Sequence, residues 1–213
     1  MDLCKSTMSK EEVEGKTILE VGSRNINYCG GFRTILETLN PKEYLGIDIK
    51  MGKGVDKILS IYDLGSEQFD IVVCTETIEH VEDWRKAIIN LMKALKIGGT
   101  ILLTAPSKGF GKHDHPNDYW RYEIEDIEFI FKEFEITLLC DQDGYVEEDI
   151  PNPLGIMVIP FIYPPDLVHY GFFLKAKKIN DNIPDFSEHC LYNINTDPRV
   201  GLEDNNIQRT LNQ

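Results

Sequence analysis

Side chains able to bind a nucleotide-like cofactor gather around a turn near the start of the chain. Glu20 and Gly22 close an apolar run, Ser23 and Arg24 follow them, and Asp48 ends the next apolar run. A glycine turn between a strand and a helix leaves backbone N–H groups open to an anion. A carboxylate about 20 residues further on is the group that binds ribose hydroxyls in such folds. The spacing therefore predicts a cofactor site, with a ligand-free turn and a turn-capping acid as the alternatives.

A second set of reactive side chains lies in a polar and aromatic insert, residues 105–122. An imidazole that titrates near neutral pH can take a proton from a hydroxyl nucleophile, so we predict His115, then His113, as the general base. His80 is a third candidate, although a histidine beside Glu79 can equally serve only to shape its loop. A His-x-His pair could hold a metal, but two ligands without a fixed third make a poor site, so no metal is predicted.

The end of the insert reads PNDYWRY and admits two interpretations. In one, Asp118, Tyr119 and Arg121 contact the substrate. In the other, the segment is a packing clasp, in which Trp120 and Tyr122 cover the core while Arg121 pairs with an acid. The residue types do not decide between the two.

A sheet with helices must position both sets, because short β-branched runs alternate with amphipathic runs along the chain. This alternation is typical of βαβ units and predicts an α/β fold with a mostly parallel sheet. The predicted strands are 17–21, 44–48, 55–59, 70–74, 100–104, 135–140 and 170–177. The predicted helices are 31–39, 84–95 and 124–134, where apolar residues recur every three or four positions. Residues 143–168 contain several prolines and are predicted to form an apolar flap or edge excursion.

Four motifs occur in the order ILEVGS, YLGID, FDIVVCTETIEHVEDW and LKIGGTILLTAPS. In order and spacing this series resembles the class I S-adenosylmethionine-dependent methyltransferases, and the resemblance spans roughly residues 17–178. It implies a Rossmann-like, doubly wound sheet of seven strands in the order 3-2-1-4-5-7-6, with strand 7 antiparallel. The segment HPNDYWR is also similar to an HPxDYWR segment of some small bacterial-type members.

The resemblance further implies where the cofactor, S-adenosyl-L-methionine, would bind. Glu20 and Gly22 would lie against its methionine part, Asp48 would bind the ribose hydroxyls, Ile49 would pack on adenine, Ser60 and Ile61 would flank the adenine ring, and Thr75 and Glu76 would lie under the sulfonium.

Two departures from the family's pattern stand out. Arg24 and Ile26 replace glycines of the usual loop, and Ser60 replaces an acid near the adenine amine. Arg24 could instead reach the cofactor's carboxylate through a charge-assisted contact.

Composition restricts the class of protein and its partners. The chain has 213 residues and a formal net charge of −14, which disfavours nucleic acid and anionic membranes as partners. We predict one domain over residues 1–179, followed by a tail, 180–213, that is either loose or packed on the surface. The five cysteines are widely spaced and the start of the chain lacks an apolar leader, so we expect reduced thiols and a cytoplasmic protein.

The predicted function is transfer of a methyl group to oxygen, or less favourably nitrogen, of a small-molecule acceptor such as a sugar or another metabolite. Holding the acceptor in line with the methyl carbon would supply most of the rate. One alternative is a catalytically weak, methyltransferase-like scaffold that acts through a partner. Another is a nicotinamide-dependent oxidoreductase, which would require GxGxxG where this chain reads GSRNIN.

Overall fold

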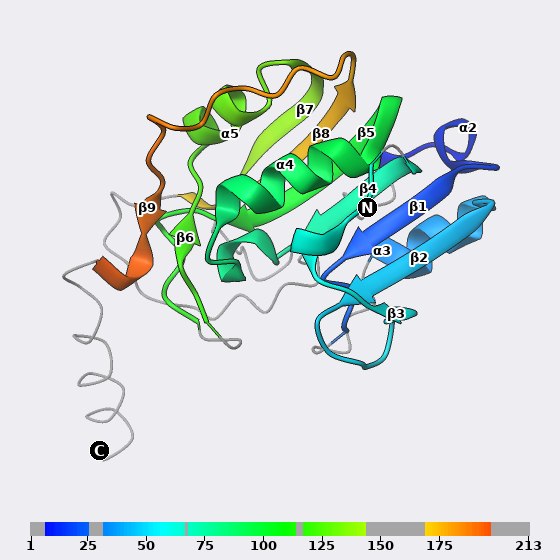
Figure 1. The fold of residues 1–213 in the computed structure, drawn as a ribbon, viewed down its shortest axis with the longest axis horizontal. Helices are drawn as coiled ribbons and strands as arrows, with labels where there is room; N and C mark the ends of the chain where they lie inside the picture. Colours follow the sequence, from blue (N-terminus) through cyan, green and yellow to red (C-terminus); the bar gives the residue numbers. More distant parts are fainter. Residues whose placement is uncertain (1–6, 26–31, 67, 114–116, 144–168, 197–213) are drawn as a thin grey trace.

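A seven-stranded mixed sheet organises the chain in the computed structural model, which describes residues 7–25, 32–66, 68–113, 117–143 and 169–196 (Figure 1). Its strands are β1 (Thr17–Val21), β2 (Glu43–Asp48), β3 (Lys57–Ile58), β4 (Phe69–Thr75), β5 (Leu95–Pro106), β7 (Phe134–Asp143) and β8 (His169–Lys178). They lie in the order β3-β2-β1-β4-β5-β8-β7. Only β8 runs antiparallel to its neighbours. Counted in chain order within this sheet, the arrangement is 3-2-1-4-5-7-6, and the Rossmann-like fold class is confirmed.

Helices cover both faces of the sheet (Figure 1). The α-helices are α2 (Lys10–Val13), α3 (Phe32–Leu36), α4 (Trp84–Ala94) and α5 (Ile124–Ile130), and the short 3₁₀ helices are η1 (Glu37–Leu39), η2 (Ile61–Asp63), η3 (Ile78–His80) and η4 (Ile194–Thr196). A separate two-stranded sheet pairs β6 (Trp120–Arg121) with β9 (Tyr192–Asn193).

Alternation along the central strands explains the two apolar layers. In β4, Val72 and Cys74 join the cluster under α4 and α5, whereas Ile71 and Val73 join the cluster under α2 and α3. Successive side chains of a strand point to opposite faces, so a continuous apolar run is buried on both sides. This double burial fixes the register of β4, and therefore the position of the residues that follow it.

Several predicted elements have different bounds in the structure, among them the strand expected at 100–104, which extends over Leu95–Pro106. The strand expected at 55–59 is limited to Lys57–Ile58, at the exposed edge of the sheet. The helix expected to reach residue 95 ends at Ala94, because Leu95 already pairs with Phe69 before an irregular stretch that precedes Thr100. The helix expected at 124–134 ends at Ile130, and β7 begins at Phe134. Residues 144–168, most of the predicted flap, lie outside the described ranges.

The first part of the predicted tail packs on the domain. Phe186 lies against Trp84 of α4, with ring centroids 5.6 Å apart, and only 4% of it is exposed. Arg85 donates hydrogen bonds from its guanidinium to the carbonyls of Phe186 and His189. Strand β9 then pairs with β6. Residues 180–196 therefore form part of the folded structure, whereas residues 197–213 lie outside the described part of the chain.

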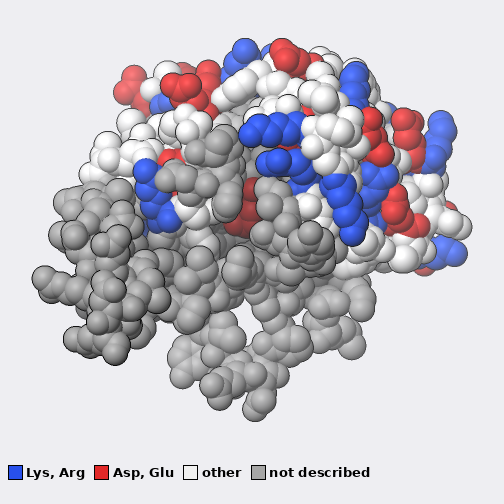
Figure 2. Space-filling model, turned by 90° about the horizontal axis from the view of Figure 1, so that it is seen from below, with Lys and Arg blue, Asp and Glu red and all other residues white. Residues whose placement is uncertain are grey.

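The surface carries both signs of charge. On the face shown in Figure 2, acidic and basic side chains are interspersed over the described area. Within the residues that the structure describes, no helix combines the length and the apolar character needed to cross a bilayer.

We expect Phe186→Ala to lower the free energy of unfolding by about 3 kcal/mol, because it leaves a cavity between α4 and α5. Urea unfolding followed by circular dichroism measures this loss. Glu188→Ala, an exposed change two residues away, serves as the control and should have little effect. Equal stabilities for wild type and Phe186→Ala would contradict the packing role of this segment.

Candidate functional site

The topology brings the predicted cofactor-binding positions to one edge of the sheet. Gly22 follows β1, Asp48 ends β2 and Thr75 ends β4, and these three strands are parallel neighbours. Their carboxyl ends therefore meet, at the edge where open α/β sheets bind ligands. Glu76 and Ser60 begin the loops that leave this edge.

The turn after β1 is shaped by close packing. Gly22 has φ +76°, and a Cβ there would lie 2.0 Å from Thr77 Oγ1, so only glycine fits. The N–H groups of Gly22 and Ser23 both donate to Ile47 O, at 2.9 and 3.0 Å. The expected open N–H groups are therefore absent at these two positions, because the turn uses them to hold β2. Residues 26–31 lie outside the described ranges.

Asp48 presents a carboxylate beside an exposed apolar side chain. Asp48 Oδ1 accepts a hydrogen bond from Lys50 N at 2.8 Å and lies 3.8 Å from Arg24 Nε. Ile49 is 59% exposed. A carboxylate followed by an open apolar surface fits a ribose diol and an adenine ring, so these residues suit the adenosyl group. Arg24 extends toward Asp48, and its predicted contact with the cofactor's carboxylate stays a prediction.

Ser60 and Ile61, the two predicted neighbours of adenine, also make contacts that stabilise the fold. Ser60 caps η2, its hydroxyl accepting from Tyr62 N. Ile61 is buried in the core and its carbonyl accepts from Asn90 Nδ2. The expectation for Ile61 is corrected accordingly: the core holds its side chain, so any contact with adenine would involve its backbone.

Glu20 lies buried in β1, at the predicted methionine end of the cofactor. Burial raises the pKa of Glu20 to about 7, against the lowering effects of the Tyr44 hydroxyl and of Arg33. The site thus contains a carboxyl group that exchanges its proton near neutral pH.

Glu76 follows β4 in a strained conformation. Its φ of +46° is in the left-handed region, which non-glycine residues rarely adopt. Thr104 holds it there: Glu76 N donates to Thr104 O at 3.1 Å, and Thr104 Oγ1 donates to Glu76 Oε1 at 2.8 Å. Burial and the nearby charge of Glu79 raise the pKa of Glu76 to about 7. Such strain is concentrated at functional sites, and here it aims a carboxyl group at the sheet edge.

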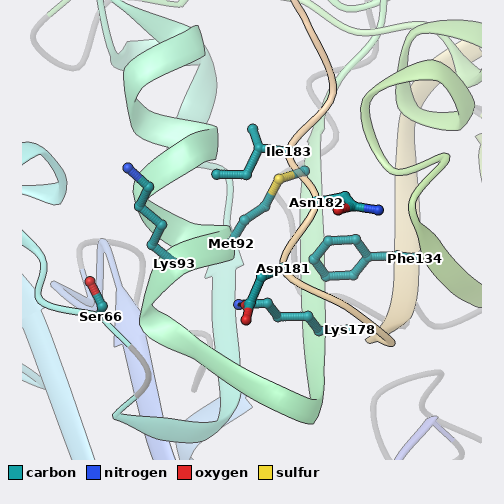
Figure 3. A pocket seen from close by; sticks show the side chains of 8 residues that line it. All are labelled: Ser66, Met92, Lys93, Phe134, Lys178, Asp181, Asn182 and Ile183. Atoms are coloured by element: carbon teal, nitrogen blue, oxygen red, sulfur yellow. Dashed lines mark ion pairs between the residues drawn. The ribbon is translucent and has the colours of Figure 1, made fainter.

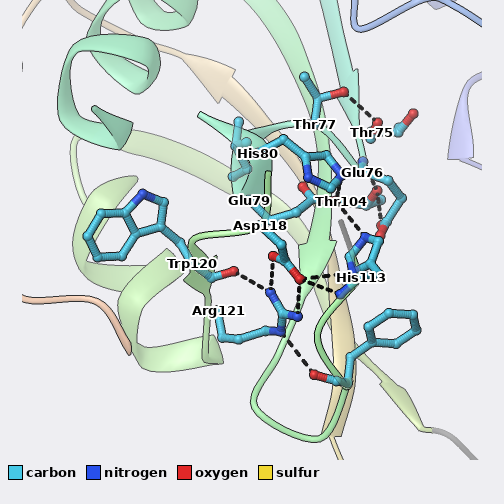
Figure 4. A network of polar contacts seen from close by, with 12 residues as sticks. Thr75, Glu76, Thr77, Glu79, His80, Thr104, His113, Asp118, Trp120 and Arg121 are labelled. Carbon is cyan, nitrogen blue, oxygen red and sulfur yellow. Dashed lines mark hydrogen bonds and ion pairs between the residues drawn. The ribbon is translucent and has the colours of Figure 1, made fainter. Parts of the chain in front are cut away.

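A carboxylate and two imidazoles meet just beyond Glu76 (Figure 4). Glu79 is fully buried, and its Oε1 lies 3.4 Å from His80 Nε2 and 3.7 Å from His113 Nε2. The two imidazole rings meet edge to face, with centroids 5.0 Å apart. The structure thus joins His80 and His113, two predicted catalytic residues from segments far apart in the sequence. His115, the third, lies outside the described ranges.

The surroundings of His113 oppose a role as general base at neutral pH. Burial lowers its pKa, but the carboxylates of Asp118 and Glu79 outweigh this effect and raise the pKa to about 9. A histidine with that pKa is mostly protonated at pH 7 and has no free nitrogen to accept a proton. His113 therefore fits the predicted base role poorly in this environment.

Asp118 and Arg121 form a buried ion pair. Arg121 Nη1 and Nη2 donate to Asp118 Oδ1 and Oδ2 at 2.6 and 2.7 Å, and neither side chain is exposed. Arg121 also donates to the carbonyls of Phe110, Gly111 and Trp120. The pair holds the pKa of Asp118 well below its usual range. This corrects the expected substrate contact for these two residues, because their charges and donors are already used within the protein.

The segment 117–122 clasps the loop that contains Glu79. Tyr119 N donates to Glu79 O, Trp120 Nε1 to Val81 O and Tyr122 Oη to Ile78 O. The packing-clasp interpretation thus describes Trp120 and Tyr122. The side chain of Tyr119 is half-buried, and its contact with substrate stays a prediction.

Sequence reasoning did not select Glu79 or Thr104 as site residues. Glu79 carried a signal, since it adjoins His80 in the family's EH pair, but its burial beside His113 depends on the fold. Thr104 lies within an apolar strand, and nothing in its sequence context indicates a role in the site.

A separate pocket lies at the opposite edge of the sheet, lined by residues that include Met92, Phe134 and Lys178 (Figure 3). Lys178 is buried, donates to Leu95 O and pairs with Asp181 at 2.7 Å. Leu95 and Phe134 begin β5 and β7, so this pocket lies far from the strand ends that carry Asp48 and Glu76.

The raised pKa of Glu20 predicts that the free energy of unfolding decreases as the pH rises. Its folded pKa of about 7 exceeds the ordinary 4.5, so the folded state binds the proton more tightly and loses this advantage between about pH 4.5 and 7. Between pH 5 and pH 8, the free energy of unfolding of the cofactor-free wild type should fall by about 3 kcal/mol more than that of Glu20→Gln. Urea unfolding at each pH measures both values. Glu43→Gln, an exposed change, should run parallel to wild type. Parallel curves for Glu20→Gln and wild type would contradict a raised pKa.

Comparisons with known proteins agree with this geometry. A family profile described as "Methyltransferase domain" matches residues 4–146. Phosphoethanolamine N-methyltransferase 2 of Caenorhabditis elegans is 28% identical over 92 residues, which are 43% of this chain and 21% of that protein. The chain thus spans about a fifth of the length of this curated relative.

Two solved structures share the fold. An S-adenosylmethionine-dependent methyltransferase from Mesorhizobium loti has a TM-score of 0.57 at 13% identity, over 82% of this chain and 95% of that one. Phosphoethanolamine N-methyltransferase 2 of Haemonchus contortus, in complex with S-adenosyl-L-methionine, has a TM-score of 0.56 at 17% identity, over 79% and 50%. With the family profile and the sheet edge described above, they identify this chain as a member of the methyltransferase domain family, with the fold of the S-adenosylmethionine-dependent methyltransferases.

Proposed function

We propose that this methyltransferase passes the methyl group of S-adenosylmethionine to an oxygen of a small acceptor, such as a sugar or another metabolite. The observation that supports this is the polar group of Glu79, His80 and His113 next to Glu76, at the end of β4. On the family's pattern the sulfonium lies over this strand end. An acceptor that enters here meets carboxylate and imidazole groups, which suit a hydroxyl.

The cofactor supplies the chemistry by carrying an activated methyl group on a sulfonium cation. The protein's part is to position the two partners. We assign Asp48 and Ile49 to the adenosyl end and Thr75 with Glu76 to the sulfonium end, and the clasp at 117–122 to the wall on the acceptor side. In-line positioning alone can contribute about 7–11 kcal/mol to lowering the barrier.

Transfer to nitrogen is the second candidate. Its support is the 28% identity over 92 residues to a phosphoethanolamine N-methyltransferase. A scaffold that binds cofactor weakly has support only in the departures at Arg24 and Ile26, and the methyltransferase family leaves the nicotinamide alternative without support. A cytosolic location stays part of the proposal, in keeping with the thiols of Cys74 and Cys190, which form no disulfide within the described residues.

Asp48→Ala should raise the dissociation constant for S-adenosylmethionine by about 10- to 100-fold, because hydrogen bonds to a charged acceptor contribute about 1.5–3 kcal/mol. Isothermal titration calorimetry measures this change. Glu43→Gln, at the far end of the same strand, should leave the constant unchanged. If Asp48→Ala bound as tightly as wild type, the adenosyl group would not lie at this edge.

The acceptor class is tested with methyl-labelled cofactor and a panel of sugars, nucleotide sugars, small phenols and phosphoethanolamine. We expect label on a hydroxyl compound, and less label with Asp48→Ala at low cofactor concentration. Label found only on phosphoethanolamine would overturn transfer to oxygen and favour the second candidate.

A further inference from the structure

The buried carboxylate of Glu79 lacks the hydrogen bonds that such a group needs. Its side chain has no exposed area, and neither of its oxygens accepts a hydrogen bond from the residues that the structure describes. Burying an ionised carboxylate without compensation costs several kcal/mol. The Nε2 atoms of His80 and His113 lie 3.4 and 3.7 Å from Glu79 Oε1, which is too far for strong hydrogen bonds. This arrangement points to a species that belongs between the three side chains.

Both imidazoles are oriented by a contact on their other nitrogen. His80 Nδ1 is hydrogen-bonded to the carbonyl oxygen of Asn117. His113 Nδ1 lies 3.2 Å from Asp118 Oδ2, and Arg121 in turn fixes Asp118. Histidines that bind metals nearly always have a backbone carbonyl or a carboxylate on the nitrogen that is not the ligand. Here the arrangement occurs twice, and both Nε2 atoms face Glu79.

The distances suit one metal ion. Ligand atoms of Glu79, His80 and His113 all lie within 4.8 Å of one another. Bonds of about 2.0–2.2 Å to nitrogen and oxygen place two tetrahedral ligands roughly 3.3–3.5 Å apart. The observed 3.4 and 3.7 Å from Glu79 Oε1 are close to this separation, and the two imidazole ligand atoms lie within 4.8 Å of each other, so small rotations of the histidine rings would bring all three side chains around one cation.

We propose that Glu79, His80 and His113 bind a divalent transition-metal cation of the Zn²⁺ type at the end of β4. Two imidazoles and one carboxylate favour such an ion over Mg²⁺ or Ca²⁺, which prefer oxygen ligands throughout. Three protein ligands leave a position open, as in catalytic zinc sites.

The two histidines of the insert, taken alone, predict no metal site. The missing ligands come from η3, which the clasp holds against His113.

The role of the ion rests on the proposed function, whereas its binding does not. The cluster lies near Glu76, just after β4, where the sulfonium is expected. An acceptor hydroxyl bound there would be oriented and acidified by the cation, which would deepen the proposal of an oxygen acceptor.

Cobalt titration tests the site directly. Full-length protein is treated with a chelator, the chelator is removed, and Co²⁺ is added while visible absorption is recorded. We expect one equivalent to bind with the absorption of a low-coordinate nitrogen and oxygen site, and Zn²⁺ to abolish that signal. Mg²⁺ and Ca²⁺ at the same concentration should not compete. Absence of stoichiometric binding, or displacement by Mg²⁺ as effective as by Zn²⁺, overturns the proposal.

Variants locate the binding. His113→Gln and His80→Gln should each abolish the cobalt signal, and Asp118→Asn should weaken binding by about 10- to 100-fold through loss of the group that orients His113. His189→Gln is the matched control, because His189 also pairs with an acid, Asp126 at 2.9 Å, but lies outside the cluster. Circular dichroism shows which variants are folded. Undiminished binding by either folded ligand variant, or its loss in His189→Gln, contradicts the assignment.

The same preparation separates this inference from the proposed function. Calorimetry with S-adenosylmethionine on metal-free and Zn²⁺-loaded protein reports cofactor binding independently of cobalt. Cofactor binding without cobalt binding overturns only the metal site. Cobalt binding with no label transferred to any hydroxyl compound leaves the metal site standing and contradicts the oxygen acceptor.

Discussion

The buried ion pair between Asp118 and Arg121 is the interaction on which the rest of the site depends. Its two charges are fully enclosed and joined by two short hydrogen bonds, and the spare donors of Arg121 hold the carbonyls of the loop before it. A buried pair of this kind contributes little net stability compared with apolar packing, yet removing one partner is costly. Its value therefore lies in placement, because Arg121 ties Asp118 to the carbonyls of Phe110 and Gly111, which follow β5 at the carboxyl end of the sheet.

The clasp, residues 117–122, positions the loop that follows β4. Backbone and side-chain donors of residues 119–122 bind the carbonyls of Ile78, Glu79 and Val81, so the loop after β4 cannot move independently of the insert after β5. Ile194 and Asn195 add hydrogen bonds to the carbonyls of Tyr119 and Asp118 from the far end of the described chain. Segments separated by more than 70 residues thus form one rigid wall beside the predicted sulfonium position. Such preorganisation suits an enzyme whose main task is positioning.

The frame of the fold was predictable because its signals are local. Apolar runs located β1, β2, β4 and β5, and helical spacing located α4 and α5 to within a few residues. Pairing of distant elements set the bounds that differed, as where Leu95 leaves α4 to pair with Phe69. Within the site, Gly22 and Asp48 were accessible to spacing rules. The contacts of Ile61, Arg121 and Glu79 depend on burial in three dimensions, and residue type alone does not give burial. Arg121 illustrates this: its sequence context suited both interpretations, and full enclosure favours the clasp.

Charge balance at the end of β4 connects the cofactor with the cluster. A sulfonium is cationic before methyl transfer and neutral after it, so nearby carboxylates stabilise the reactant state more than the transition state and slow the reaction. Glu76 and Glu79 both lie there, and burial together with the nearby charge of Glu79 raises the pKa of Glu76, so this end of the sheet disfavours two negative charges. A cation held by Glu79 and the two histidines would cancel the remaining charge without approaching the methyl group. It would also lower the pKa of a bound acceptor hydroxyl, which favours the deprotonated, nucleophilic form. The strained turn at Glu76 and the buried Glu79 would then act together. They would place acidic groups next to a cationic cofactor without stabilising its reactant state so strongly that methyl transfer slows.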